Sequence, residues 1–314
     1  MPHFQTDPEA FRLWRAEPAN WLPLVAQIAR AEGIPADGVT AFPTGTNLVV
    51  ALDDQVILKI FPPIYRRQVL SEKTTLRQLH GRLDIPIPAL LAEGAWEDWS
   101  YLAISRLPGI LGSSVWDRLA EDQKERILRQ IGETIAQVQA CPLGELGQIE
   151  PRWADFIARQ IEGCLARHRR LGLPARFLDD LQTLLDEAPD LVPAAPSPVI
   201  LTGEYIPENF LLAETDGRWD LAGLIDFGDV MTGWGEYDLL GPGAFMAAGR
   251  PGRIRALLEG YGYAPGQIDP TLPRRLLILM LLHRASNLGT ICIEGWEDKI
   301  GSLQDLGPLV WANI

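Results

Sequence analysis

The sequence predicts an α+β protein of two lobes, a small N-terminal lobe rich in strands and a larger C-terminal lobe that is mostly helical. Short runs of Val, Ile and Leu dominate the first third of the chain, and long amphipathic stretches dominate the rest. One further group of short apolar runs interrupts the helical part. Pro108 and Gly109 break the pattern, so we expect lobes at 1–107 and 108–314.

The N-terminal lobe reads as an alternation of helices and strands. Apolar residues recur at helical spacing in its helices, and Gly33 ends the first of them. Val, Ile and Leu fill the strands, and the turns at Asp53-Asp54 and Glu97-Asp98 join them as hairpins. The expected elements are a helix over 20–32, strands over 48–52 and 56–61, a helix over 64–79, and strands over 89–93 and 101–107.

The C-terminal lobe begins with long amphipathic helices, expected over 121–140, 153–170 and 174–187. A Pro-rich stretch at 189–198 then leads into short strands and polar loops that continue to Asp229. Helices resume at about Gly235 and continue to the C-terminus. This order places a small sheet inside a helical lobe.

Composition excludes several classes of protein. Acidic residues outnumber basic residues 41 to 28, so we expect no binding to nucleic acid or to anionic membranes, and a cationic partner or plain solubility remains. Three widely spaced cysteines without a CxxC pair argue against a disulfide framework or a zinc site. The longest apolar stretch, 276–282, is far shorter than the roughly 20 residues of a membrane span, and the N-terminus lacks a signal-peptide pattern. We expect a soluble cytoplasmic monomer or homodimer.

The segment 199–229 holds the most informative polar residues. Glu204 and Asn209 lie in the first loop, and Asp226 follows the apolar run that ends at Ile225. Transfer of a phosphoryl group to an alcohol requires a carboxylate near the hydroxyl, which Glu204 supplies, and oxygen ligands for magnesium, which Asn209 and Asp226 supply. Each residue alone could equally cap a turn or a helix.

Lys59 lies in the strand VILKIF, and Glu72 lies on the helix that follows. A phosphate requires a fixed cation, and a carboxylate on an adjacent helix can hold the ammonium in place. Taken alone, a lysine on a strand points to solvent by alternation, and Glu72 is an exposed helix charge. The order of these residues, ahead of Glu204, Asn209 and Asp226, makes coincidence improbable.

Two further stretches could contact a nucleotide. The loop before the Lys59 hairpin can present hydroxyls and backbone N–H groups to phosphate, although a plain turn is the better explanation of the loop taken alone; its residues are Thr44, Gly45, Thr46 and Asn47. The loop contains neither GxGxxG nor a Walker sequence. The strand end from Ala103 to Leu107, including Ser105, could offer main-chain groups to an adenine edge, or could be an ordinary buried strand.

The chain resembles the aminoglycoside phosphotransferase family, over roughly 42–243. That family's catalytic loop reads His-Gly-Asp-x-x-x-x-Asn, and here Thr202-Gly203-Glu204 precedes Asn209 at the same spacing. Its metal motif matches Ile225-Asp226-Phe227. The stretches IPIPALLAE, YLAISRLPG and PRWADFI are similar to those of hygromycin B kinases and their uncharacterised relatives.

The resemblance implies a protein-kinase-like fold, with a nucleotide-binding N-terminal lobe and a C-terminal lobe that carries catalysis and acceptor binding. It implies that Lys59 with Glu72 positions the phosphates of ATP (or GTP), and that Asn209 and Asp226 bind Mg²⁺. Glu204 takes the position of the catalytic base. The implied reaction moves the γ-phosphate to a hydroxyl of a small molecule, an aminoglycoside or amino sugar.

Departures from the family pattern leave alternatives open. Glu204 replaces the usual Asp, Thr202 replaces the usual His, and Gln139 lies where the family commonly has His. The chain could be fully active, weakly active, or a catalytically silent nucleotide-binding relative, and the acceptor could be another small alcohol. A peptide kinase is less expected, because no Ala-Pro-Glu segment follows Asp226.

A cationic acceptor would be met by carboxylates and by aromatic rings that stack on a sugar. The candidates after the metal motif are Asp229, Trp234, Glu236, Asp238, Glu294 and Trp296, with Glu297 and Asp298 beside them. Acidic residues near helix ends are more often solvated or capping. Asp238 could equally be structural, and we expect His283 and Arg284 to lie in the core or in an interface rather than to take part in catalysis.

Overall fold

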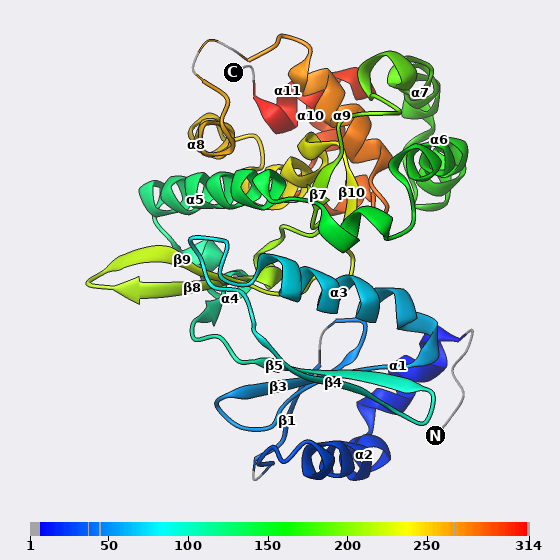
Figure 1. The fold of residues 1–314 in the computed structure, drawn as a ribbon. Coiled ribbons are helices and arrows are strands. Elements are labelled where there is room, and N and C mark those ends of the chain that lie inside the picture. The colour runs from blue at the N-terminus through cyan, green and yellow to red at the C-terminus, as the bar shows by residue number, and fades with distance from the viewer. Residues whose placement is uncertain (1–6, 37, 44, 265, 267, 313–314) are drawn as a thin grey trace. The chain divides into compact units, whose positions relative to one another are not determined.

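The structure, a computed structural model, describes residues 7–36, 38–43, 45–264, 266 and 268–312 (Figure 1). The chain forms two compact units. The first unit comprises Met1–Arg82, Pro86–Pro108 and Leu224–Val230. The second comprises Leu83–Ile85, Gly109–Gly223 and Met231–Ile314. The short segment Leu224–Val230 therefore packs with a unit whose other residues lie far earlier in the chain.

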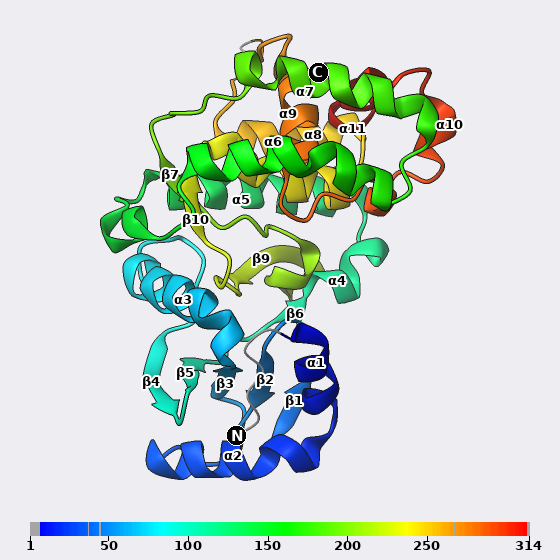
Figure 2. The same cartoon turned by 90° about the vertical axis from the view of Figure 1, so that its right-hand side faces the viewer.

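The first unit is a five-stranded antiparallel sheet with helices on both faces. The strand order is β1-β2-β3-β5-β4, and both views show α2 on one side of the sheet and α3 on the other (Figures 1 and 2). The elements are α1 (Pro8–Ala16), α2 (Pro18–Ala31), β1 (Thr40–Phe42), β2 (Leu48–Ala51), β3 (Val56–Phe61), α3 (Arg66–Leu79), β4 (Leu90–Trp96) and β5 (Trp99–Ser105).

Strand alternation decides which residues of β3 meet which helices. Leu58 and Ile60 are fully buried in a core that also contains Phe11 of α1 and Trp21 and Ile28 of α2. Successive side chains of a strand point to opposite faces. The residue between Leu58 and Ile60, Lys59, therefore points to the face that α3 covers.

The predicted elements of this unit are present, with small shifts at their ends. The predicted hairpin is β2 paired antiparallel with β3, and the predicted turn at Glu97-Asp98 joins β4 to β5. Neither α1 nor β1 was predicted. The start of α1 has a local signal, because the Asp7 side chain accepts a hydrogen bond from the Ala10 amide at 2.9 Å and Pro8 is the first helical residue.

The second unit is mostly helical and contains two small antiparallel sheets, of order β6-β8-β9 and β10-β7. Its helices are α4 (Gly112–Val115), α5 (Glu121–Ala140), α6 (Trp153–Arg170), α7 (Leu178–Leu191), α8 (Pro251–Tyr261), α9 (Leu272–Leu282), α10 (Trp296–Lys299) and α11 (Leu306–Trp311). Its strands are β6 (Ile110–Leu111), β7 (Val199–Leu201), β8 (Phe210–Thr215), β9 (Arg218–Leu224), which ends at the first residue of the Leu224–Val230 segment, and β10 (Met231–Gly233). Short helical turns include Ala175–Phe177, Pro207–Asn209 and Gly235–Leu239.

Helices α6, α7 and α11 pack around α9, whose residues from Leu276 to Leu282 are all buried, and α5 packs against α8. Helices α5 and α6 have the predicted bounds. The third predicted helix, 174–187, was placed too early, since α7 begins after the turn Ala175–Phe177 and continues past Pro189. Pro189 lies in the last turn of α7, where its missing N–H removes one helical hydrogen bond near the end.

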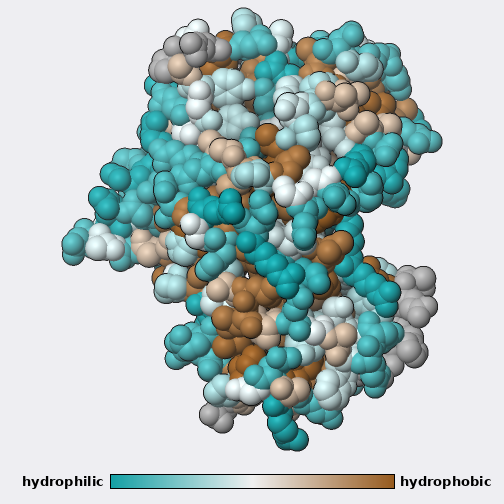
Figure 3. Space-filling model, viewed as in Figure 1, coloured by the Kyte–Doolittle hydropathy of each residue, from teal (hydrophilic) through white to brown (hydrophobic). Residues whose placement is uncertain are grey.

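The α+β class and the strand-rich and helical parts are as predicted. Within the described residues, no helix is both long enough and apolar enough to span a membrane. On the face shown in Figure 3, hydrophilic residues cover most of both units, and hydrophobic residues gather over the sheet of the first unit.

Candidate active site

Lys59, in the middle of β3, is buried in the first unit and holds two carboxylates. Its Nζ lies 2.7 Å from Oε1 and 2.6 Å from Oε2 of Glu72 on α3. The same Nζ lies 3.2 Å from Oδ1 of Asp226, which is 167 residues away in the chain. We call Lys59, Glu72 and Asp226 the lysine cluster. Because Lys59 is only 5% exposed, the alternative of a solvent-facing lysine is wrong.

Burial and charge act in opposite directions on this cluster. Burial by itself lowers the pKa of Lys59, but the carboxylates of Asp226 and Glu72 outweigh it, so the pKa of Lys59 is raised and the side chain stays cationic. Burial also raises the pKa of Glu72, against the lowering effect of the Lys59 ammonium. The cluster is therefore a fixed cation that depends on its carboxylate partners.

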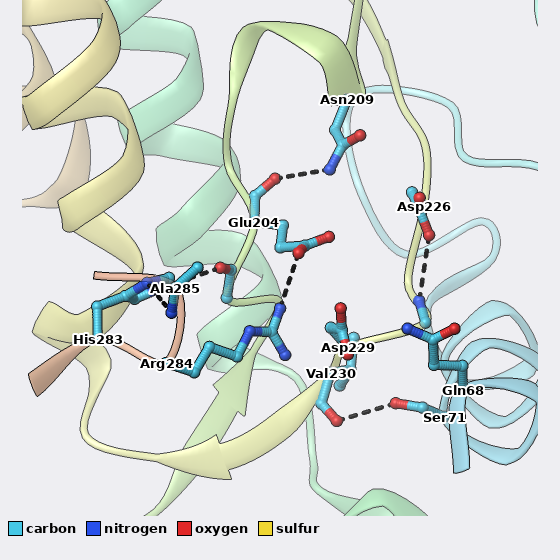
Figure 4. A network of polar contacts seen from close by, with 12 residues as sticks. Gln68, Ser71, Glu204, Asn209, Asp226, Asp229, Val230, His283, Arg284 and Ala285 are labelled. Atoms are coloured by element: carbon cyan, nitrogen blue, oxygen red, sulfur yellow. Dashed lines mark hydrogen bonds and ion pairs between the residues drawn. The ribbon is translucent and has the colours of Figure 1, made fainter. Parts of the chain in front are cut away.

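Asp226 lies at a strained turn directly after β9. Its φ is +66°, a left-handed conformation that is uncommon for residues other than Gly, and its Oδ1 accepts from the Gly228 amide at 3.4 Å. The Ser71 hydroxyl on α3 donates to the Val230 carbonyl at 2.9 Å, which ties the end of this segment to the helix (Figure 4). Strained residues concentrate at functional sites, where the surrounding structure holds them.

The predicted phosphate loop packs against the same helix. Asn47 is buried and donates from Nδ2 to Oε1 of Gln68 on α3 at 2.9 Å. Gly45 has a φ of +90°, which favours glycine, and Thr46 is exposed. Thr44 lies outside the described residues. Gln68 also lies beside Gly228, 3.4 Å from the position a Cβ would take there, so one α3 side chain contacts both the loop and the Asp226 turn.

The predicted adenine-facing strand end is the C-terminal end of β5. The Ser105 hydroxyl accepts from the Ala89 amide at 2.8 Å, and the Ser105 amide donates to the Ala89 carbonyl at 2.9 Å. These two bonds fix the backbone at Ser105. Leu107 follows the strand and is partly exposed.

In the second unit, a buried carboxylate shapes the loop that carries Glu204. Asp238 accepts from the Thr202 amide at 3.1 Å and from the Gly203 amide at 2.8 Å. Burial raises the pKa of Asp238 to about 7, while these backbone donors and Gln139 lower it. Gly203 has a φ of +71°, so this sharp turn favours the glycine that the motif places here.

Glu204 is partly exposed and forms an ion pair with Arg284, which we call the glutamate pair. Oε1 of Glu204 lies 3.0 Å from Nη2 of Arg284, and the two face each other in Figure 4. The Glu204 carbonyl accepts from Nδ2 of Asn209 at 3.0 Å. This bond uses the amide nitrogen of Asn209 as the donor, and the role of its oxygen as a metal ligand stays a prediction.

Most of the predicted acceptor residues already pair or stack with other residues of their own unit. Glu236 is buried and pairs with both Nε and Nη2 of Arg275 at 2.7 Å. The Arg275 guanidinium lies 5.5 Å from the Trp234 ring centroid. Trp296 is buried, stacks on Phe177 at 5.8 Å and donates to a carbonyl.

Three more candidates differ from these. Asp238 holds the Glu204 loop, as described above. Asp229, in the first unit, lies 3.7 Å from Arg67, and Glu294, in the second, is exposed together with Asp298. The part that any of these residues plays in acceptor binding stays a prediction.

Sequence reasoning missed the contact that Arg284 makes. Arg284 was expected to be a core or interface residue, yet its side chain reaches Glu204. Its neighbour His283 is half-buried, stacks on Tyr237 at 4.8 Å and lies 3.3 Å from the Gly203 carbonyl. In the sequence, His283 and Arg284 are marked only by the apolar helix that precedes them, and this pattern does not predict which residues their side chains contact.

Comparisons with known proteins support the motifs. The sequence model of the phosphotransferase enzyme family (APH) matches residues 39–275. The search of curated proteins gave no match. Many solved structures match this chain. The three described below are 20% identical to it or less, so they show the fold alone.

Three of these structures are of aminoglycoside phosphotransferases. The GDP complex of wild-type aminoglycoside 2'-phosphotransferase-IIIa has a TM-score of 0.67 at 18% identity, covering 92% of this chain and 98% of that one. The GDP and kanamycin complex of APH(2")-IIia has a TM-score of 0.67 at 20% identity, covering 83% and 89%. APH(3'')-Id from Streptomyces rimosus, in complex with ADP and streptomycin, has a TM-score of 0.59 at 20% identity, covering 84% and 98%. The chain therefore belongs to the phosphotransferase enzyme family and has the two-lobed, protein-kinase-like α+β fold of the aminoglycoside phosphotransferases that its motifs resemble.

Proposed function

We propose that the protein is an ATP-dependent phosphotransferase that moves the γ-phosphate to a hydroxyl of a small molecule. The observation that carries this proposal is the buried lysine cluster. A cation that is excluded from water and held by two carboxylates is what a transferred phosphate requires. Family membership gives the same reaction class.

The donor set suits magnesium. Mg²⁺ prefers oxygen ligands, usually one or two from side chains with the rest from phosphates and water. Asp226 offers a carboxylate, and Asn209, whose nitrogen donates to the Glu204 carbonyl, offers an amide oxygen. Bound there, the ion would neutralise charge on the phosphates. Lys59 would hold phosphate oxygens, and Glu72 would keep the ammonium in place.

Glu204 is the proposed base for the acceptor. The acceptor hydroxyl donates to the Glu204 carboxylate and its oxygen forms a bond to the γ-phosphorus. The bond between that phosphorus and the β–γ bridging oxygen breaks, ADP leaves, and the hydroxyl proton passes to Glu204 and then to water. Since the transition state is loose, the orientation of Glu204 matters more than its basicity.

The remaining roles follow from the same proposal. Residues 1–107 form the nucleotide-binding lobe, and 108–314 the catalytic and acceptor-binding lobe. The phosphates meet Gly45, Thr46 and Asn47, with Thr44 beside them, and the adenine meets the main chain from Ser105 to Leu107. The fixed backbone at Ser105 and the packing of Asn47 on α3 support these roles. GTP is the second donor to be tested.

For the acceptor we propose an aminoglycoside or amino sugar of the hygromycin type. The net charge of −13 favours a cationic partner, and two of the similar structures are complexes with kanamycin and streptomycin. Asp229, Trp234 and Glu294 are the candidates with exposed surface, whereas Glu236, Asp238 and Trp296 are buried.

The test measures ADP release and labelled phosphate transfer with ATP or GTP, Mg²⁺, and a panel of aminoglycosides, amino sugars, amino alcohols and polyols. We expect turnover with at least one acceptor, and loss of turnover on Lys59→Met. Lys73→Met is the matched control, because Lys73 pairs with the surface carboxylate of Glu93 at 3.6 Å. The absence of transfer to every acceptor, with nucleotide bound, contradicts the proposal.

One observation favours a second candidate, a silent nucleotide-binding relative. The carboxylate of Glu204 is already paired with Arg284, and Glu204 and Thr202 both depart from the family loop. A silent relative binds nucleotide through the lysine cluster without transferring phosphate. Calorimetric titration with ATP and Mg²⁺, run beside the acceptor panel, separates the two candidates.

A further inference from the structure

Arg284 is the side chain that fixes the carboxylate of Glu204 within the second unit. Nη2 of Arg284 lies 3.0 Å from Oε1 of Glu204, and the two side chains are 21% and 31% exposed. Glutamate has one more rotatable bond than the aspartate that the family usually has at this position, so its carboxylate sweeps a larger volume unless something holds it. A guanidinium held 3.0 Å from the carboxylate can do so by ion pairing.

The backbone of Arg284 is itself held by a rigid core. Its amide donates to the Tyr237 hydroxyl at 3.2 Å, and the preceding His283 ring stacks on Tyr237 at 4.8 Å. Tyr237 is 1% exposed and packs edge-on against Trp153 and Phe156. The base of the Arg284 side chain therefore starts from a position that packing defines.

The loop before Glu204 is shaped to receive the guanidinium. A Cβ at Gly203 would lie 3.6 Å from Nη2 and 3.8 Å from Cζ of Arg284, so the guanidinium lies against the Gly203 backbone. His283 meets the Gly203 carbonyl, and Asp238 holds the Gly203 amide at 2.8 Å. Both partners of the glutamate pair are thus anchored on the same buried framework.

We propose that Arg284 is a positioning residue that orients Glu204 toward the acceptor hydroxyl and makes a glutamate serve where relatives use an aspartate. This inference rests on the proposed function of Glu204. Arg284 acts through Glu204 and not on the nucleotide, so its loss lowers kcat and leaves nucleotide binding unchanged. A shift of about 1 Å in a catalytic group lowers the rate on the order of 100-fold, so we expect a fall in kcat of about 10- to 100-fold.

The experiment compares Arg284→Ala, Arg284→Gln and Arg284→Lys, with Arg170→Ala as the control because Arg170 is exposed at the end of α6. Arg284→Gln keeps most of the side-chain volume, and urea unfolding checks each variant. We expect Arg284→Lys to recover most of the kcat that Arg284→Ala loses, with KM for ATP within about twofold throughout. A kcat within twofold of wild type in Arg284→Ala overturns the inference, and so does a loss that Arg284→Lys leaves in full.

A double-mutant cycle with Glu204→Asp tests whether Arg284 acts through Glu204. The shorter aspartate withdraws from the guanidinium, so Arg284→Ala should lower kcat by no more than about twofold in that background. An equal fall in both backgrounds shows that Arg284 acts by another route and overturns the inference.

Crystal structures of wild type and Arg284→Ala separate this inference from the proposed function. We expect the Glu204 carboxylate to take several rotamers or a new position in the variant. If no acceptor is phosphorylated, the proposed function fails. The inference about Arg284 is then judged only by whether the Glu204 carboxylate differs between the two crystal structures. An unchanged Glu204 carboxylate in the variant overturns it.

Discussion

The lysine cluster and the glutamate pair solve the same physical problem, the holding of a charged group, in opposite ways. Lys59 and Glu72 are buried, and the ammonium lies between two carboxylates. Glu204 and Arg284 are both partly exposed and form an ion pair with each other. Burial makes the first arrangement intolerant of the loss of a partner, whereas the second depends on the anchored backbone of Arg284 and is weakened by exposure to water.

Lys59→Met removes the cation of the lysine cluster and should have the largest effect. We expect a loss of about 1,000-fold in kcat/KM, because the fixed cation for the phosphates is removed. We also expect a loss of about 3–5 kcal/mol in the free energy of unfolding, because Glu72 is left buried and unpaired. Kinetics and urea unfolding measure the two effects.

The double variant Lys59→Met/Glu72→Leu isolates burial from catalysis. Apolar side chains of similar volume should recover most of the stability but none of the activity. Recovery of activity together with stability would mean that the cluster serves folding alone.

Glu204→Asp tests the glutamate pair. The carboxylate withdraws by about 1 Å and away from Arg284, so we expect kcat to fall on the order of 100-fold with KM for ATP unchanged. Steady-state kinetics with the preferred acceptor measure it. A silent relative behaves differently, since it would stay inert or gain activity on return to the family's aspartate.

His283, which packs beneath the glutamate pair, should make the stability of the protein depend on pH. Burial, with the nearby Arg284 charge, lowers the pKa of His283 from 6.5 to about 4. The folded state therefore keeps the ring neutral, and the stability it contributes is fully present above pH 6.5 and is lost as the pH falls toward 4. His283→Phe keeps a ring on Tyr237 and removes this titration.

We expect the unfolding free energies of wild type and His283→Phe to converge as the pH falls from about 7 to about 4.5, with a change of up to about 3 kcal/mol in their difference. Urea unfolding at several pH values measures this difference. A constant difference across that range would show that His283 does not titrate differently in the two states.

Gly203→Ala tests the turn that precedes Glu204. The φ of +71° disfavours alanine, so we expect a loss of about 1–2 kcal/mol in stability and a several-fold fall in kcat as the loop shifts. Gly217→Ala is the matched control, since Gly217 has a φ of +77° and open space around it. The control should lose similar stability and keep its kcat; equal kcat in the two variants would contradict a role for the Gly203 turn.

Glu294→Gln should have the smallest effect. Glu294 is exposed, and exposed charge pairs contribute about 1 kcal/mol or less. If Glu294 meets a cationic acceptor, we expect KM for that acceptor to rise two- to fivefold, while Glu133→Gln, an exposed change on α5, leaves KM unchanged. An unaltered KM in Glu294→Gln removes this residue from the acceptor surface.

Local patterns predicted much of the fold. Helices α5 and α6 appear at their predicted bounds because apolar spacing and the residues at their ends are properties of the segment itself. The start of α7 was misplaced because a Pro174 signal opens a short turn before the helix, and local pattern does not separate the two. Strand β1 and helix α1 were also missed, although Asp7 and Pro8 mark the start of α1 in the sequence.

The sequence by itself determined the family, the order of the motifs and the residues that carry charge at each of them. Only the tertiary structure decided the state of those charges, because it depends on groups that lie far away in the chain. Asp226 pairs with Lys59 from 167 residues away in the chain, Arg284 pairs with Glu204 from a distant segment, and Glu236 pairs with Arg275. Charge interactions and desolvation act through space, and a local pattern reports only what lies along the chain.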